Sequence, residues 1–185
     1  AIAAIDLLGS GGLARNTLVA TVMSNFGLDE AVERAGGKVI RTKVGDRYVI
    51  EEMMRGGYNV GGEQSGHMIF GDYATTGDGI VSALQVLRIM AQTGKPLGEL
   101  KKCLSKYPQA QRNLKVREKR PLEELPEVAG LIAAAEASLN GAGRVLLRYS
   151  GTEPKIRLLI EGRDGESINR HADCIIGRIA AEIGA

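Results

Sequence analysis

The sequence predicts an α/β domain with a mixed, largely parallel sheet, followed by a small α+β domain. Three observations lead to this fold class. Strand-like and helix-like segments alternate through the first part of the chain, which is typical of parallel sheets covered by helices. A stretch interrupted by glycine and proline comes next, and beyond it the order becomes strand, helix, strand, strand, helix. We therefore expect two domains, at residues 1–105 and 106–185.

The elements of the first domain follow from hydrophobic periodicity. Runs of β-branched apolar residues predict buried strands, and apolar residues that recur with the helical period predict helices that end at glycines. In order, we expect a strand at 16–24, a helix at 28–35, a strand at 38–44, a helix at 46–55, short strands at 60 and 68–70, and a helix at 78–90. The core side of the last helix is expected to consist of Ile80, Val81, Leu84, Leu87 and Met90.

The second domain begins beyond a boundary stretch that contains Gly94, Pro96 and Pro108. Pro126 suits the first turn of a helix, where a backbone N–H would have no helical partner in any case. We expect strands at 113–118, 144–149 and 155–161, and helices at 126–139 and 167–183.

Composition argues against several classes of partner. The 24 Lys+Arg and 22 Asp+Glu residues leave a net charge of +2, too small to favour nucleic acid or an anionic membrane. The chain has two Phe and no Trp, so we expect no platform for stacking nucleic-acid bases. The most basic segment is expected to be a solvated strand edge. It contains Arg112, Lys115, Arg117, Lys119 and Arg120.

The cysteines predict neither a metal centre nor a disulfide framework. Cys103 and Cys174 lie far apart, and His171 is the only ligand-like neighbour. A structural zinc site needs four ligands, so we expect two small hydrophobic residues in a reducing compartment. No apolar run approaches the roughly 18–20 residues of a membrane span, and nothing resembles a signal peptide. We therefore expect a cytoplasmic location.

A glycine-rich loop is the first candidate site. Eight of the 25 glycines fall between Gly56 and Gly79. Within this window Glu63 and Ser65 stand two residues apart on a locally extended chain, so a carboxylate and a hydroxyl point the same way. This pair suits the vicinal hydroxyls of a sugar, and the alternative is a glycine-rich hairpin with a solvated Glu63.

Two neighbouring residues of this loop are expected to have structural roles. We expect His67 to be a packed histidine. Asp78, which precedes a predicted helix, is expected to be its N-cap.

A short loop between two predicted strands is the second candidate. Ser150, Gly151 and Thr152 supply hydroxyls and exposed backbone N–H groups, and Arg148 and Arg157 stand near the two ends. These are the ingredients of a phosphate site. The alternative is a plain β-hairpin with solvated arginines.

A glycine turn before a predicted helix is the third candidate. Gly45, Asp46 and Arg47 lie between a strand and a helix, at the edge where open α/β sheets bind ligands. The alternative is that Asp46 is an ordinary helix cap.

Four motifs, taken in this order, resemble the C-terminal half of the bacterial phosphoglucosamine mutases, a branch of the α-D-phosphohexomutase superfamily. They are TKVGDRYV (42–49), GGEQSGH (61–67), TTGDG (75–79) and RYSGTEP (148–154). The second and fourth motifs mark the superfamily, and the first points to the glucosamine branch. The chain also begins at Ala1 inside an apolar stretch, so we expect it to be a piece of a longer protein.

The resemblance implies roles for the candidate residues. Residues 1–105 correspond to domain 3, with the sugar-binding loop, and 106–185 to domain 4, with its TATA-binding-protein-like fold and phosphate-binding loop. Glu63 and Ser65 match the ligands of the sugar hydroxyls. Gly45, Asp46 and Arg47 match the specificity loop. The residues that match the loop gripping the unreactive phosphate are Arg148, Ser150, Gly151, Thr152 and Arg157.

The resemblance also implies an activity that this chain lacks the means to perform alone. The family's isomerases interconvert glucosamine 6-phosphate and glucosamine 1-phosphate through a sugar bisphosphate, and so feed UDP-N-acetylglucosamine and peptidoglycan precursor synthesis. The phosphoserine and the Mg²⁺ loop belong to domains 1 and 2, and neither pattern occurs here. We therefore expect substrate-binding residues but no catalytic residue and no metal site in this chain. The alternative is a stand-alone phosphosugar-binding module with a regulatory role.

Overall fold

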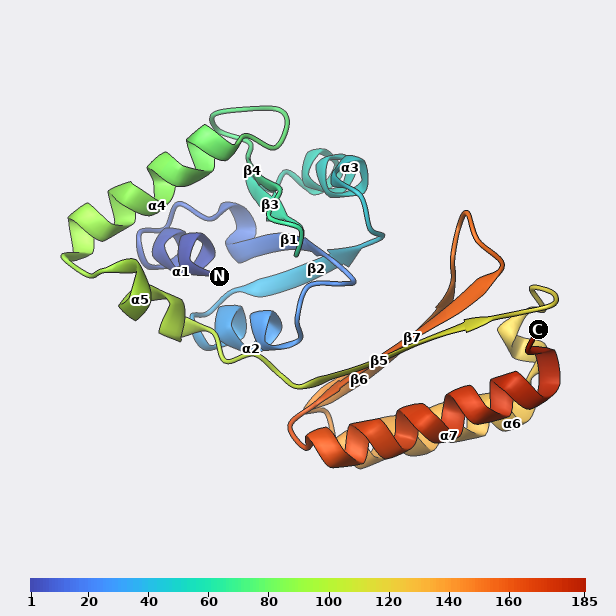
Figure 1. The fold of residues 1–185 in the computed structure, drawn as a ribbon. Coiled ribbons are helices and arrows are strands. Elements are labelled where there is room, and N and C mark those ends of the chain that lie inside the picture. Colours follow the sequence, from blue (N-terminus) through green and yellow to red (C-terminus); the bar gives the residue numbers. More distant parts are fainter. The chain divides into compact units, whose positions relative to one another are not determined.

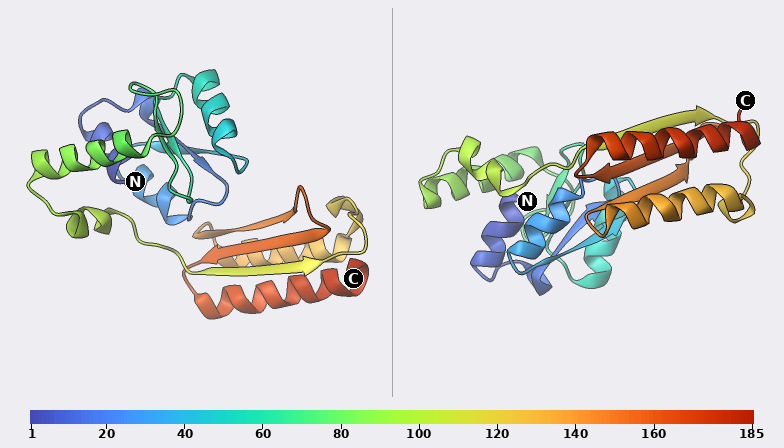
Figure 2. Two further views of the ribbon diagram at one scale, coloured as in Figure 1. Left: turned by 45° about the horizontal axis from the view of Figure 1, so that its top comes forward. Right: turned by 90° about the horizontal axis from the view of Figure 1, so that it is seen from below.

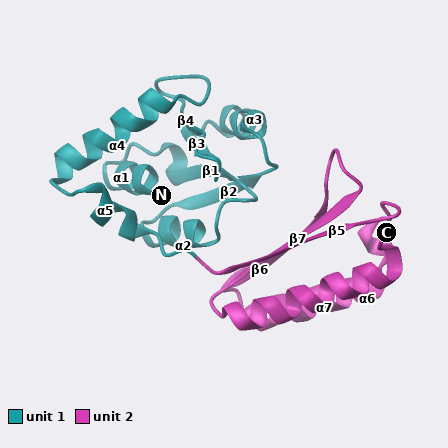
Figure 3. Cartoon of the chain, in the orientation of Figure 1, with its two compact units in different colours: residues 1–106 teal, residues 107–185 magenta.

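The chain separates into two units after Lys106 in the computed structural model, which describes residues 1–185 (Figure 3). The first unit comprises residues 1–106 and the second residues 107–185. The buried hydrophobic residues form clusters that lie within one unit or the other. Each unit therefore has a core of its own.

The first unit is built on a four-stranded mixed sheet (Figure 1). Its elements are α1 (Ile2–Gly9), β1 (Thr17–Thr21), α2 (Gly27–Arg34), β2 (Lys38–Thr42), α3 (Asp46–Gly56), β3 (Val60–Gly62), β4 (Met68–Phe70), α4 (Gly79–Thr93) and α5 (Leu97–Leu100), with 3-10 turns at Ala14–Asn16 and Lys101–Cys103. The strand order is β2-β1-β3-β4. β1 pairs in parallel with β2 and β3, whereas β4 returns antiparallel to β3. The carboxyl ends of β1, β2 and β3 consequently lie at one edge of the sheet.

Helices cover both faces of this sheet (Figures 1 and 2). Leu18 packs in a cluster shared with α1, α2 and α4, whereas the next residue, Val19, packs with Val49 and Met53 of α3. A Cβ at Gly61 of β3 would come within 2.5 Å of the Val49 side chain and 2.6 Å of the Met53 sulfur. Helix α3 thus packs directly on the backbone of β3, which fixes the start of the loop that follows.

Helix α4 turns a different face to the core from the predicted one. Ile89 is buried and Val81 packs against the same cluster. Ile80, Leu84 and Leu87 are instead 75%, 58% and 56% exposed. The prediction of a core side containing these three was wrong because α4 carries apolar residues on almost every face, so the helical period fits more than one of them.

The second unit is an antiparallel sheet with two helices on one face (Figure 2). Its elements are β5 (Gln109–Lys115), α6 (Pro126–Leu139), β6 (Gly143–Tyr149), β7 (Lys155–Gly162) and α7 (Gly165–Ile183), with a 3-10 turn at Leu122–Glu124. The strand order β5-β7-β6 makes β7 the central strand. The buried residues Ile168, Ala172, Ile175 and Ile179 recur with the helical period and form the core stripe of α7.

The sheet face away from these helices carries polar residues. Glu161 of β7 follows Ile160, which lies in the core, so the two side chains point to opposite faces. Glu161 is fully buried and accepts hydrogen bonds from Arg144 Nε at 2.6 Å and Gln109 Nε2 at 2.7 Å. A buried charge on this face is thus paired across all three strands.

The predicted fold class is confirmed in both units, and the helix expected at 126–139 has the same bounds in the structure. Helix α1 was not predicted, because its apolar run shows no helical alternation of polar and apolar residues. Strand β5 begins at Gln109, before the predicted start at 113. Cys103 is half-buried but Cys174 is exposed, so Cys174 does not fit the expectation of a packed hydrophobic residue.

No helix of the chain combines the length and the apolar character that crossing a bilayer demands.

Candidate functional site

The loop that contains Glu63 lies at the carboxyl edge of the first sheet. It joins β3 to β4, and the neighbouring strands β1 and β2 end at Thr21 and Thr42, which are paired in the ladder. Thr21 Oγ1, fully buried, donates to Gln64 Oε1 at 2.9 Å. The loop is therefore fastened to the end of β1, by a contact for which the sequence offered no signal.

Glu63 is held in place by a backbone N–H from the neighbouring loop between β2 and α3. Its Oε1 accepts the N–H of Gly45 at 2.8 Å, and its Oε2 lies 3.4 Å from Ser65 Oγ. The side chain is only 9% exposed, so the alternative of a solvated Glu63 is wrong. The carboxylate and the Ser65 hydroxyl lie together, as the two-residue spacing predicted.

Of the three residues at the predicted glycine turn, Gly45 is the one that forms a hydrogen bond with the Glu63 loop. Its φ of 128° is a conformation that other residues rarely adopt, and it is the N-cap residue of α3. Asp46 is the first helical residue, and its Oδ1 accepts the N–H of Arg47 at 2.7 Å. Arg47 is 83% exposed and donates to Glu51 Oε1 at 2.7 Å.

His67 is not the packed histidine that we expected. Its side chain is 64% exposed, and Nδ1 lies 2.9 Å from Ser65 Oγ and 3.9 Å from Glu63 Oε2. The residue follows Gly66 at the tip of the hairpin, where no core element covers it. An imidazole, a hydroxyl and a carboxylate therefore form one polar cluster in this loop.

In the second unit, the loop at 150–154 joins β6 to β7. The Ser150 N–H donates to the Lys155 carbonyl at 2.8 Å and closes the hairpin. The N–H groups of Gly151 and Thr152 and the hydroxyls of Ser150 and Thr152 make no hydrogen bond within the protein, and Gly151 and Thr152 are exposed. The loop thus presents several donors without a partner.

Two arginines stand beside these donors. Arg148 and Arg157 are direct partners in the antiparallel ladder of β6 and β7. Arg148 forms no ion pair, whereas an Arg157 terminal nitrogen donates to Glu153 Oε2 at 2.9 Å. The Arg157 Nε is buried and has no hydrogen-bond partner. Hydrogen bonds from Lys155 and, to a smaller extent, Arg157 lower the pKa of Glu153.

The segment after β5 supports this loop from the side. Lys119 Nζ donates to the Ser150 carbonyl at 2.7 Å, and the Tyr149 hydroxyl donates to the Arg120 carbonyl at 2.7 Å. Burial raises the pKa of Tyr149. The prediction for Lys119 was therefore incomplete: the residue is exposed, but its ammonium anchors the loop.

Two other cations of this basic segment form hydrogen bonds with α7. Arg112 Nε donates to Asp173 Oδ1 at 2.8 Å, and an Arg117 terminal nitrogen donates to the Glu182 carbonyl at 3.0 Å. They tie the strand to α7.

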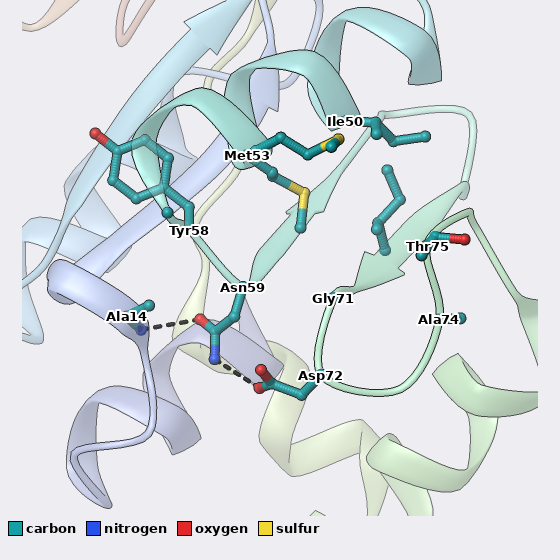
Figure 4. A pocket seen from close by; sticks show the side chains of 12 residues that line it. Ala14, Ile50, Met53, Tyr58, Asn59, Gly71, Asp72, Ala74 and Thr75 are labelled. Atoms are coloured by element: carbon teal, nitrogen blue, oxygen red, sulfur yellow. Dashed lines mark hydrogen bonds between the residues drawn. The ribbon is translucent and has the colours of Figure 1, made fainter.

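A cavity of the first unit lies away from the Glu63 loop. It has a volume of about 420 Å³ and lies between α3 and the segment after β4, toward the amino edge of the parallel strands (Figure 4). Ile50, Met53 and Ile69 make it largely apolar. The side-chain amide of Asn59, which lines the cavity, already has partners: its Nδ2 donates to Asp72 Oδ2 at 2.7 Å and its Oδ1 accepts the Ala14 N–H at 2.9 Å. The cavity is therefore largely apolar, has no cationic side chain in its lining, and does not suit a sugar phosphate.

Candidate metal ligands are not gathered anywhere in the chain. No group of three or more His, Cys, Asp or Glu side chains is arranged to hold a metal ion. A divalent cation of the kind used in phosphoryl transfer does not fit the residues present.

Two family models match the chain in succession. Residues 1–107 match "Phosphoglucomutase/phosphomannomutase, alpha/beta/alpha domain III", and residues 112–177 match "Phosphoglucomutase/phosphomannomutase, C-terminal domain".

Relatives of similar sequence are phosphoglucosamine mutases. The protein from Anaeromyxobacter sp. (strain Fw109-5) is 55% identical over 97% of this chain and 38% of its own length. That from Geotalea daltonii is 56% identical over 100% of this chain and 40% of its own length. The chain thus spans about two fifths of the length of these relatives.

Solved structures with the same fold are more distant in sequence. The N-acetylphosphoglucosamine mutase of Aspergillus fumigatus has a TM-score of 0.78 and 21% identity, over 97% of this chain and 42% of that protein. A second structure of that enzyme, described as a complex with GlcNAc-6P and magnesium, has a TM-score of 0.75, also with 21% identity, over 96% and 42% of the two chains.

Proposed function

The chain belongs to the phosphoglucomutase/phosphomannomutase family, and from this membership we propose that it is the substrate-holding part of a phosphoglucosamine mutase. The whole enzyme is an isomerase that interconverts glucosamine 6-phosphate and glucosamine 1-phosphate through a sugar bisphosphate. Its product supplies UDP-N-acetylglucosamine for peptidoglycan precursors. In this proposal the chain binds the phosphosugar, and the rest of the enzyme transfers the phosphoryl group.

The first unit is proposed to bind the sugar. Glu63 can accept two hydrogen bonds and Ser65 can donate or accept, which suits neighbouring hydroxyls. The Gly45 N–H binds Glu63 Oε1, and Oε2 points toward Ser65. The carboxylate is therefore oriented before a ligand binds. Gly45, Asp46 and Arg47 are proposed to form the adjoining specificity loop.

The second unit is proposed to bind the phosphate that does not react. The observation that carries this proposal is the set of unpartnered donors at one hairpin: the hydroxyls of Ser150 and Thr152, the N–H groups of Gly151 and Thr152, and the guanidinium of Arg148. Each hydrogen bond to a charged group contributes about 1.5 to 3 kcal/mol, so a few convergent donors suffice to hold a phosphate monoester. Arg157 completes the set.

Phosphoryl transfer itself is assigned to the remainder of the enzyme. A divalent cation would neutralise charge on the moving phosphoryl group when bound there. The residues of this chain do not form such a site, so their part is to hold and orient the sugar phosphate.

Amide NMR of the ¹⁵N-labelled chain tests both binding roles. Glucosamine 6-phosphate should shift the amides of Gly151 and Thr152 as well as those of Gly45 and Glu63. Inorganic phosphate should shift only the first pair, and glucosamine only the second. Unmoved amides in the 150–152 loop at saturating ligand would remove the phosphate assignment, and unmoved amides at 45 and 63 would remove the sugar assignment.

A coupled mutase assay tests the assignment of chemistry. The chain alone should show no turnover, and the full-length enzyme should convert glucosamine 6-phosphate. Turnover by the chain alone would contradict the proposed division of labour. A stand-alone regulatory module is not favoured, because the chain aligns with only about 40% of each relative and the relatives are mutases.

A further inference from the structure

The outer face of helix α4 is an exposed apolar strip. Its members recur at positions i, i+3, i+4, i+7 and i+11, so they lie on one side of the helix. All five are classed as exposed. The residues of this surface, named here the α4 stripe, are Ile80, Ala83, Leu84, Leu87 and Ala91.

Such a strip is unusual for a helix that is meant to face water. The exposed side of α7 in the same chain carries Asn169, Arg170 and Asp173, which is the ordinary pattern. Helices that are apolar on all sides are typically buried. A contiguous apolar surface marks a place where something packs, whereas single exposed apolar residues do not.

The charges of α4 argue against a lipid surface as the occupant. Arg88 is the only charged residue of the helix, and its guanidinium donates to Asp6 Oδ2 at 2.6 Å. Helices that lie on membranes carry several Lys and Arg on the polar side of the apolar strip. The α4 stripe therefore has the composition of a protein interface.

The size of the strip argues against a second copy of this chain. From Ile80 to Ala91 a helix rises about 16 Å, and the strip is one helix wide. A stable association of separate chains buries about 800 Å² on each partner, far more than such a strip offers. A small apolar contact is sufficient when the two surfaces belong to one polypeptide, because the linkage gives a high effective concentration.

The relatives contain the segment that can provide such a surface. The chain aligns with 38% and 40% of the lengths of two of them. The two matched family models are domain III and the C-terminal domain, so most of the unmatched length precedes residue 1 of this chain in the relatives.

We propose that the α4 stripe is the surface on which the region N-terminal to domain III packs in the full-length protein. The inference rests on the proposed function only in that the chain is part of a longer mutase. Leu84 and Leu87 form the centre of the contact, and Ile80 and Ala91 lie at its two ends.

Thiol accessibility tests the proposal without any measurement of turnover. Leu84→Cys is introduced into the 185-residue chain and into the full-length protein, and alkylation of the peptide that contains position 84 is followed by mass spectrometry. The thiol should react freely in the chain and about tenfold or more slowly in the full-length protein. Leu97→Cys serves as the control, because Leu97 is a 46% exposed leucine of α5 outside the stripe.

Three outcomes overturn the proposal. Equal alkylation rates at position 84 in both proteins mean that nothing covers the stripe. Slow alkylation in the 185-residue chain that speeds up on dilution means that a second copy covers it. Equal slowing at positions 84 and 97 means that the full-length protein protects the unit in general. Since none of these readouts involves a phosphosugar, failure here is separate from failure of the proposed function.

A charge substitution gives a second, independent measurement. Leu84→Lys should leave the unfolding midpoint of the 185-residue chain unchanged, because the side chain is already 58% exposed. In the full-length protein it should lower the midpoint and make the junction before domain III more sensitive to protease. An unchanged midpoint and protease pattern in the full-length protein would contradict the contact.

Discussion

Arg148 and Arg157 lie directly opposite each other in the antiparallel ladder of β6 and β7, so their side chains leave the same face of the sheet. Like charges in directly opposed positions destabilise a sheet. Glu153 offsets part of this repulsion by pairing with Arg157 at 2.9 Å, but Arg148 has no counter-ion of its own. An anion at the 150–154 loop would complete the neutralisation.

Replacing Arg148 with Ala should weaken phosphosugar binding and leave the fold intact. Loss of a guanidinium that donates to a charged ligand corresponds to about a ten- to hundredfold rise in Kd. Calorimetric titration of the chain with glucosamine 6-phosphate measures the change. Arg170→Ala removes an exposed arginine of α7 and should leave Kd unchanged. An unfolded Arg148→Ala variant would show instead that Arg148 is structural.

Replacing Glu153 with Gln should tighten phosphate binding. The carboxylate now pairs with Lys155 and Arg157, two cations beside the loop, and it repels an incoming phosphate. Because the pair is partly solvated, the expected gain in affinity is only about two- to fivefold. The same titration measures it. Weaker binding in this variant would mean that Glu153 orders the loop more than it competes with the ligand.

The ionisation of Glu153 gives a pH-dependent prediction. Its pKa is lowered in the folded state, chiefly by the hydrogen bond from Lys155. The stabilisation from this carboxylate is therefore present above its unfolded pKa and is lost as the pH falls through the lower folded value. Carboxyl NMR should show Glu153 titrating below the ordinary range for glutamate, and Lys155→Ala should return it toward that range. A titration curve that Lys155→Ala leaves in place would contradict this cause.

The sequence predicted the helices and strands well where the hydrophobic period agrees with residues that begin or end an element, such as proline, glycine and asparagine. Pro126 and the left-handed Asn140 mark the two ends of α6, and its bounds matched the prediction. The failure at α4 has a physical reason. A helix with apolar residues on every side does not reveal which side meets the core, and only the tertiary contacts of Ile89 decide it.

The sequence predicted which residues belong to the candidate sites, but it did not predict the hydrogen bonds that join those residues to distant parts of the chain. The spacing of Glu63 and Ser65 placed them on one side of a turn, which the structure bears out. The bond between Glu63 and the Gly45 N–H joins residues 18 positions apart, and local pattern carries no information on such a contact. The same holds for Lys119, whose role depends on a strand that returns beside it.

The bond between Gly45 and Glu63 predicts a graded effect of substitution. Glu63→Ala removes the acceptor, so hydrogen exchange at the Gly45 amide should accelerate and the shifts caused by glucosamine should disappear. Glu63→Gln keeps an oxygen at the same place, so Gly45 should remain protected while sugar binding weakens. Exchange measured by NMR on both variants separates the two roles of the side chain. Equal exchange at Gly45 in the wild type and Glu63→Ala would show that the bond does not hold the two loops together.

The N-cap of α4 gives a prediction for stability. Asp78 Oδ1 accepts the N–H groups of Ile80 at 2.8 Å and Val81 at 2.9 Å, so it satisfies two donors of the first turn. Asp78→Ala should destabilise α4 by about 1 kcal/mol, whereas Asp78→Asn should retain most of the cap. Hydrogen exchange of the α4 amides measures both changes. Asp164→Ala removes the corresponding cap of α7 and should instead accelerate exchange in that helix. Equal exchange in α4 for the wild type and Asp78→Ala would mean that packing alone orders the first turn, which is the turn that presents Ile80 to the outer face.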